Sequence, residues 1–157
     1  MQVIEQLKKM DDARFLTIYS ALEQQGFGPM DNEVAKAMKF RPHAIRKLPF
    51  DRRAKKAKQL LESTANAEMC YEIFGSYLIK DHKELVTGFL DLTGVEHEDG
   101  MIQNTDESQP DGTKIGEAVK ALDEKHPHED VTLYLSLCAE QWPSINQIQE
   151  TWKTRTE

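Results

Sequence analysis

The sequence predicts an all-α protein of seven or eight short helices, packed as an irregular bundle or as a short stack of helical hairpins. Apolar residues recur three and four positions apart along most of the chain, which is the period of a helix with one buried face. Glycines and prolines divide this pattern into short segments. One segment, VTLYLSL at 131–137, alternates as a strand does. We still expect a helix there, because no second strand-like segment exists to satisfy its backbone groups.

Three helices are expected before residue 40. Residues 1–10 form a short helix, and a second helix runs from Asp12 until Gly26 ends it. A third helix continues through Met38, with Asp31 as its N-cap, since an aspartate side chain accepts hydrogen bonds from the first free N–H groups of a helix. A proline that follows prevents this helix from continuing.

The next helix, from Pro49 to Glu62, is expected to have an apolar and a basic side. The apolar side is expected to face the core and holds Phe50, Ala54, Ala57, Leu60 and Leu61. The opposite side is expected to face water and holds Arg52, Arg53, Lys55, Lys56 and Lys58.

The second half of the chain continues the helical pattern. A helix is expected over 66–79, and Asp81 with Glu84 has the spacing of a capping box, so the next helix begins at once and runs to Gly94. Pro127 and Pro143 stand at the starts of the last two expected helices. Proline suits the first turn of a helix, because the N–H that it lacks would have no partner there. After a loop, the remaining helices are expected at 113–125, 129–141 and 143–152.

Two similar segments suggest an internal repeat. A shift of 45 residues places ELVTGFLDL at 84–92 over EDVTLYLSL at 129–137. If the repeat is real, residues 66–94 and 113–140 are two copies of a helical hairpin, with the second helix of each in the core. Chance similarity between amphipathic helices explains the same matches, and both explanations stay open.

Size and composition predict a single domain that does not cross a membrane. At 157 residues the chain is long enough to bury a core without disulfides, so we expect a single helical domain over 1–157. No segment reaches the ~20 apolar residues that cross a bilayer. The first residues also lack the uninterrupted apolar core of a secretory signal. We therefore expect a cytoplasmic protein.

The net charge of −7 conceals two regions of opposite charge. Between Lys36 and Lys58 there are ten Lys or Arg and a single acid, Asp51, so this stretch carries +9 and the rest of the chain −16. The loop at 95–112 carries six carboxylates and no Lys or Arg. This separation is the strongest indication of a binding surface in the sequence.

The basic helix side is the leading candidate for a site, and its proposed partner-binding cations are Arg46, Arg52, Arg53, Lys55, Lys56 and Lys58. We expect a non-enzymatic interaction module in which they attract an acidic protein partner or hold the protein's own acidic loop. RNA or DNA bound through residues 36–58 is the alternative, because clustered cations neutralise phosphates. Against it, the chain is acidic overall, and the aromatic residues of the basic segment, Phe40 and Phe50, stand where they are expected to anchor it to the core instead of stacking on bases. A solvated helix side with no partner explains the same pattern.

Histidines beside carboxylates raise a second alternative, a metal-dependent hydrolase. His97, His126 and His128 are its candidate ligands, since imidazole and carboxylate both bind zinc. Acids and histidines ahead of helices more often serve as caps and dipole partners. The chain contains none of the common phosphate-binding, nucleophile-elbow or HExxH motifs. We therefore assign no catalytic residue and no cofactor, and do not favour an enzyme.

Overall fold

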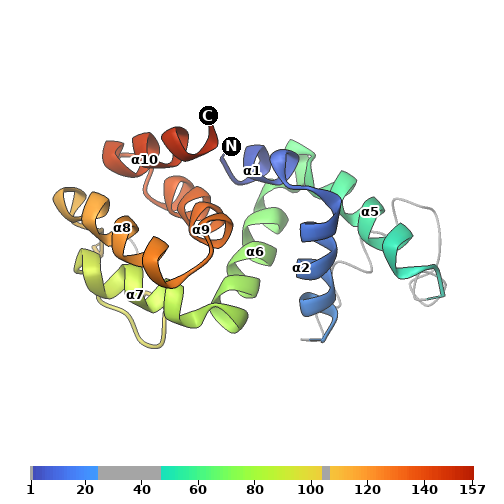
Figure 1. Ribbon diagram of the computed structural model, residues 1–157, viewed down its shortest axis with the longest axis horizontal. Helices are drawn as coiled ribbons and strands as arrows, with labels where there is room; N and C mark the ends of the chain where they lie inside the picture. The colour runs from blue at the N-terminus through green and yellow to red at the C-terminus, as the bar shows by residue number, and fades with distance from the viewer. Residues whose placement is uncertain (1, 25–46, 104–106) are drawn as a thin grey trace. The chain divides into compact units, whose positions relative to one another are not determined.

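The computed structural model describes residues 2–24, 47–103 and 107–157, and this part of the chain is all-α (Figure 1). It contains eight α-helices, two 3₁₀ helices and no β-strand. The predicted fold class is confirmed. The helix expected through Met38 and the candidate cation Arg46 lie outside the described residues. None of the helices described is long and apolar enough to span a membrane.

The chain divides into two compact units, residues 3–73 and 74–157. Helix α6 (Ala67–Asp81) passes from the first unit into the second. That both units form a single domain stays a prediction.

The first unit is built around the contact between two helices, α2 and α5. Tyr19 of α2 connects them, with its ring 6.1 Å from that of Phe15 and 5.3 Å from that of Phe50, both in stacked arrangements. Such aromatic pairs add to the free energy of burial. The elements of this unit before α6 are α1 (Gln2–Lys9), α2 (Asp12–Gln24), α5 (Phe50–Leu61) and η1 (Thr64–Asn66).

In the second unit, the other helices pack around one buried helix, α9 (Figure 1). Helices α8 and α10 pack on α9, and Phe89 of α7 meets Tyr134 of α9 edge to face, with ring centroids 5.2 Å apart. The elements after α6 are α7 (Lys83–Thr93), η2 (Gly112–Lys114), α8 (Ile115–Lys125), α9 (His128–Gln141) and α10 (Asn146–Thr156).

The strand-like segment 131–137 is helical, as predicted. Its residues are buried on every side of the helix, which explains why the sequence alternates without a helical period. A helix surrounded by protein needs no polar side, so its sequence shows no helical period. Its small polar residues are satisfied within the helix. Thr132 donates a hydrogen bond to the carbonyl oxygen of His128 at 2.8 Å, and Ser136 to that of Leu133 at 2.6 Å.

Several helix ends differ from the predicted ones. The capping box is wrong, because Asp81 is the last residue of α6 and the N-cap of α7 is His82, without a side-chain cap. The stop at Gly94 is confirmed, with φ of 76° and a Schellman bond from the Val95 N–H to the Leu90 carbonyl. Helix α10 begins three residues later than expected, so proline is not in its first turn. The 45-residue repeat stays a prediction.

Candidate functional site

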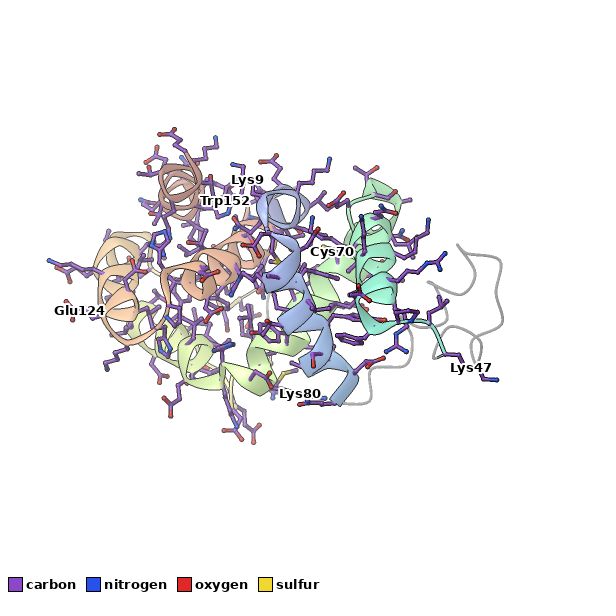
Figure 2. The ribbon with its side chains drawn as sticks, turned by 45° about the vertical axis from the view of Figure 1, so that its right-hand side comes forward. Lys9, Lys47, Cys70, Lys80, Glu124 and Trp152 are labelled. Atoms are coloured by element: carbon purple, nitrogen blue, oxygen red, sulfur yellow. The ribbon has the colours of Figure 1, made fainter. Side chains whose placement is uncertain are left out.

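The exposed cations of α5 lie on one side of the helix. Arg52 and Lys55 are exposed and Lys56 is half-buried. Positions three and four apart in a helix are neighbours on its surface, so these three side chains form one group, here called the basic stripe. Lys47, just before the helix, is exposed as well (Figure 2). The structure thus retains a compact positive surface on α5.

Arg53 does not belong to that surface. Its side chain is 7% exposed and forms an ion pair with Glu23 of α2. Its guanidinium carbon also lies 5.4 Å from the centre of the Phe50 ring. The prediction that Arg53 faces water is wrong, since a spacing of three and four places it on the buried side with Phe50, Ala57 and Leu61. Arg53 joins α5 to α2.

Lys58 is also engaged within the protein. Its Nζ lies 2.8 Å from a carboxylate oxygen of Glu62, one turn later in the chain, and its side chain is 12% exposed. Its charge is therefore largely balanced locally. Among the predicted binding cations that the structure describes, Arg53 and Lys58 form ion pairs within the protein, and the three cations of the basic stripe are in none of the ion pairs described.

A hollow lies beside the basic stripe, between α2 and α5. Its volume is about 260 Å³. Lys55 of the basic stripe lines it, so the cationic surface and the hollow are continuous. We call it the α2–α5 groove, and its lining residues are Asp12, Ala13, Phe15, Leu16, Asp51, Ala54 and Lys55.

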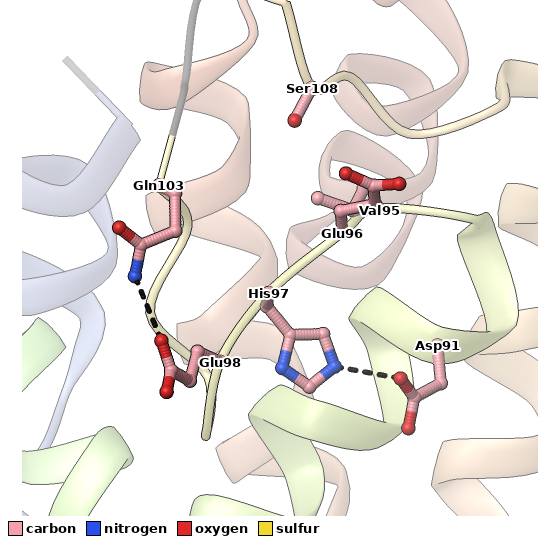
Figure 3. Close-up of a pocket in the computed structure, with 7 residues that line it drawn as sticks. All are labelled: Asp91, Val95, Glu96, His97, Glu98, Gln103 and Ser108. Carbon is pink, nitrogen blue, oxygen red and sulfur yellow. Dashed lines mark hydrogen bonds and ion pairs between the residues drawn. The ribbon is translucent and has the colours of Figure 1, made fainter.

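The acidic loop begins with a tight turn that is held by His97 (Figure 3). The imidazole Nε2 lies 2.7 Å from Oδ1 of Asp91, and its Nδ1 accepts a hydrogen bond from the Gly100 N–H at 3.0 Å. Because Nδ1 accepts, the ring proton sits on Nε2 and is donated to the Asp91 carboxylate. Both ring nitrogens are thus in use.

The turn itself is a two-residue hairpin. Glu98 and Met101 exchange two backbone hydrogen bonds, of 2.8 and 3.0 Å, around Asp99 and Gly100. Asp99 and Gly100 have φ of 55° and 89°, as in a type I′ turn. The Asp-Gly dipeptide is the sequence signal that would have predicted it. Asp99 also pairs with Lys83, with Nζ and Oδ1 3.1 Å apart, so the turn lies on α7.

A cavity of about 640 Å³ adjoins His97 and is lined by Asp91, Val95, Glu96, Glu98, Gln103 and Ser108. Three carboxylates make it acidic. Within the described residues, no group of three or more His, Cys, Asp or Glu side chains is placed to hold a metal ion. With both its nitrogens bonded, His97 is oriented as a support for the turn.

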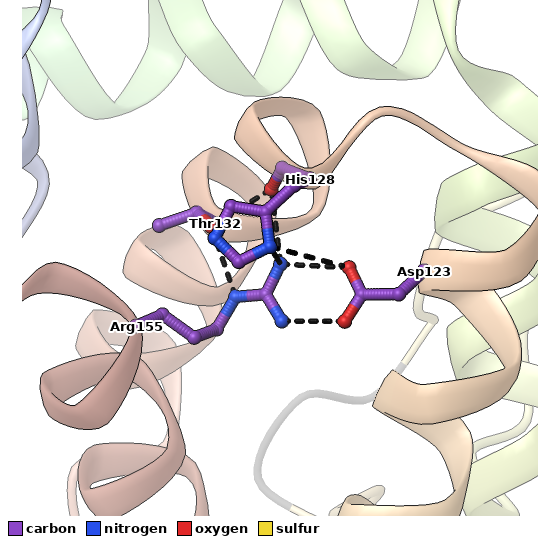
Figure 4. A network of polar contacts seen from close by, with 4 residues as sticks. All are labelled: Asp123, His128, Thr132 and Arg155. Atoms are coloured by element: carbon purple, nitrogen blue, oxygen red, sulfur yellow. Dashed lines mark hydrogen bonds and ion pairs between the residues drawn. The ribbon is translucent and has the colours of Figure 1, made fainter.

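The other two candidate histidines lie apart from this cavity. His126 follows α8 and its N–H bonds to the Leu122 carbonyl oxygen. His128 opens α9, and its Nδ1 lies 3.1 Å from Nη2 of Arg155 (Figure 4). Neither residue lines the cavity at His97. The three histidines therefore take part in separate local contacts.

Comparison of the chain with models of known families, with curated proteins and with solved structures finds no match. Among the features described, the basic stripe with the adjoining α2–α5 groove is the surface best suited to a partner. It combines accessible charge with an apolar hollow.

Proposed function

We propose that the protein is a non-enzymatic interaction module whose basic stripe binds an acidic segment of a protein. The observation that carries the proposal is the placement of exposed Arg52, exposed Lys55 and half-buried Lys56 on one side of α5. No ion pair within the described residues engages any of the three. Arg53, by contrast, is used to attach α5 to α2, so the stripe is presented on a helix that is fixed in place.

An acidic protein segment suits this surface better than a nucleic acid does. The basic stripe itself, within the part of the chain that the structure describes, offers three cations, which are few for a polyanion whose affinity grows with each phosphate neutralised. Base stacking needs exposed aromatic rings. The one aromatic residue of α5, Phe50, is half-buried and stacked on Tyr19. Carboxylates of a peptide need only the charge, and electrostatic complementarity then sets orientation and association rate.

The proposal is tested with a labelled glutamate-rich peptide that contains no apolar residue. We expect binding at low salt, measured by fluorescence anisotropy, that weakens as salt is added. The triple variant Arg52→Glu, Lys55→Glu, Lys56→Glu should lower the affinity by at least about tenfold, because each pair is turned from attractive to repulsive. Arg53 stays unchanged, since its replacement would disturb the fold.

A matched control carries the same change of charge elsewhere. Lys114, Lys120 and Lys153 are exposed and lie outside the first unit, so replacing all three by Glu should leave peptide binding nearly unchanged. Equal losses in both triple variants would mean that only net charge matters, which contradicts the proposal. Tighter binding of generic RNA or DNA, with a steep dependence on salt, would favour the nucleic-acid alternative instead. Absence of any peptide binding at low salt would also refute the proposal.

A further inference from the structure

The α2–α5 groove is sized for a side chain. At about 260 Å³ it is smaller than the roughly 300–1,000 Å³ of pockets that bind small molecules. Its lining includes three apolar residues that are shielded from water to different degrees, buried Phe15 and Ala54 and half-buried Leu16. A partner that inserts an apolar side chain here would bring its neighbouring residues next to Lys55 and the rest of the basic stripe.

The chain itself presents a segment with that chemistry. Among the described residues, two large apolar side chains are exposed, Leu92 and Met101, and Met101 is the more exposed at 56%. Met101 closes the turn of the acidic loop, directly after Asp99 and Gly100. Methionine is flexible and polarisable, so it adapts to irregular apolar hollows and is common at binding surfaces.

The turn places a carboxylate beside this methionine. Glu98 and Met101 are directly opposite in the hairpin, and residues paired in this way project from the same face. The acceptor surface has the matching arrangement, because Lys55 lines the α2–α5 groove and also belongs to the basic stripe. An apolar side chain in the groove and a carboxylate at Lys55 can thus be supplied by one rigid turn.

We infer that the acidic segment bound by the basic stripe is the 98–101 turn of a second copy of this chain, with Met101 in the α2–α5 groove and Glu98 at Lys55. The inference rests on the proposed function and identifies its partner. Asp12 and Asp51 border the groove and would repel carboxylates, so Glu98 must reach Lys55 from the side where Arg52 and Lys56 lie. The association is head to tail, with different surfaces of the two copies in contact.

A head-to-tail contact can be tested by complementation. Met101→Ser removes the inserted side chain from one chain, and Ala13→Trp fills the groove of another at an exposed position of α2. Sedimentation velocity should show concentration-dependent association of the wild type, weakened about tenfold or more in either variant, because burial of a methionine is lost. Mixed together, the two variants should form a 1:1 complex, since each retains the surface that the other lacks.

The controls separate this inference from the proposed function. Thr17 is exposed on the same helix and does not line the groove. The variant Thr17→Trp should therefore associate like the wild type. If the variants fail to complement, or if the wild type stays monomeric while the glutamate-rich peptide still binds the basic stripe, the second-copy inference is overturned and the proposed function stands. If the peptide does not bind either, both are refuted. Helical circular dichroism of each variant verifies that the fold is retained.

Discussion

Replacing Arg155 by methionine should loosen the attachment of α10 to α8 and α9. The guanidinium of Arg155 donates hydrogen bonds of 2.6 and 2.8 Å to the two carboxylate oxygens of Asp123 in α8 (Figure 4). It donates two more to α9, to Thr132 Oγ1 at 2.9 Å and to the carbonyl oxygen of His128 at 3.0 Å. Methionine retains much of the aliphatic volume but makes none of these bonds.

The exposure of the two partners sets the expected loss. The side chain of Arg155 is 8% exposed and that of Asp123 is 31% exposed. The pair thus lies between exposed pairs, worth about 0.2–1 kcal/mol, and buried pairs, which cost about 3–5 kcal/mol to break. With the two bonds to α9 included, Arg155→Met should lower the free energy of unfolding by about 2–3 kcal/mol. A double-mutant cycle with Asp123→Asn should give a coupling of about 1–2 kcal/mol.

The same pair predicts how the loss depends on pH. The hydrogen bonds from Arg155 lower the pKa of Asp123 below its ordinary value of 3.8. A carboxylate whose pKa is lower in the folded state contributes stability above its unfolded pKa, and this stability is lost as the pH falls through the folded pKa. The difference between wild type and Arg155→Met should therefore be full near neutral pH and shrink below about pH 4. Urea unfolding followed by circular dichroism measures the free energy of unfolding of the wild type and of Arg155→Met at each pH. If the gap between the two free energies stays constant down to about pH 3, the reasoning is refuted.

Three further changes test other parts of the structure. Glu23→Gln should lower the free energy of unfolding by about 2 kcal/mol, because it leaves the charge of Arg53 buried without its partner; no loss in urea unfolding would contradict this. Gly94→Ala should cost about 1 kcal/mol, since φ is 76° there, whereas Gly75→Ala inside α6 meets no atom within 4 Å and should be neutral or stabilising. Burial raises the pKa of the Cys138 thiol far above its usual range, so an aromatic disulfide reagent should modify it only after unfolding.

The fold class could be predicted because it depends on the apolar pattern summed over many residues. Segment 131–137 alternates locally as a strand does, but the sequence offers no second strand to pair with it, and this predicts a helix. The structure confirms the helix. Helix α9 is surrounded by other helices, and its Thr132 and Ser136 hydroxyls bond to carbonyls one turn earlier. An all-buried helix has no polar side from which a period could be recognised.

Single residues were harder to predict, because their surroundings are set by packing. A charged residue next to an apolar stripe normally faces water, yet Arg53 has a buried partner, Glu23, from a distant part of the sequence. Nothing in the spacing of α5 indicates that partner. Similarly, Asp81 and Glu84 have the spacing of a capping box, but α6 continues through Asp81. The turn at Asp99 and Gly100 is predictable from its Asp-Gly dipeptide, a signal that the acidic charge of the segment and its candidate ligand His97 do not carry.

Helix α5 carries a buried ion pair and an exposed cationic surface on residues that adjoin in sequence, and this determines how the proposed binding must be tested. Arg53 points to α2 and fixes the helix, while Arg52 and Lys55 point to water. A variant that reverses every basic residue of α5 would lose partner binding through unfolding as well as through charge, and the two causes would be confounded. Changing only the basic stripe leaves the ion pair to Glu23 intact. A loss of binding then reports on the surface, because the helix that carries it stays packed on α2.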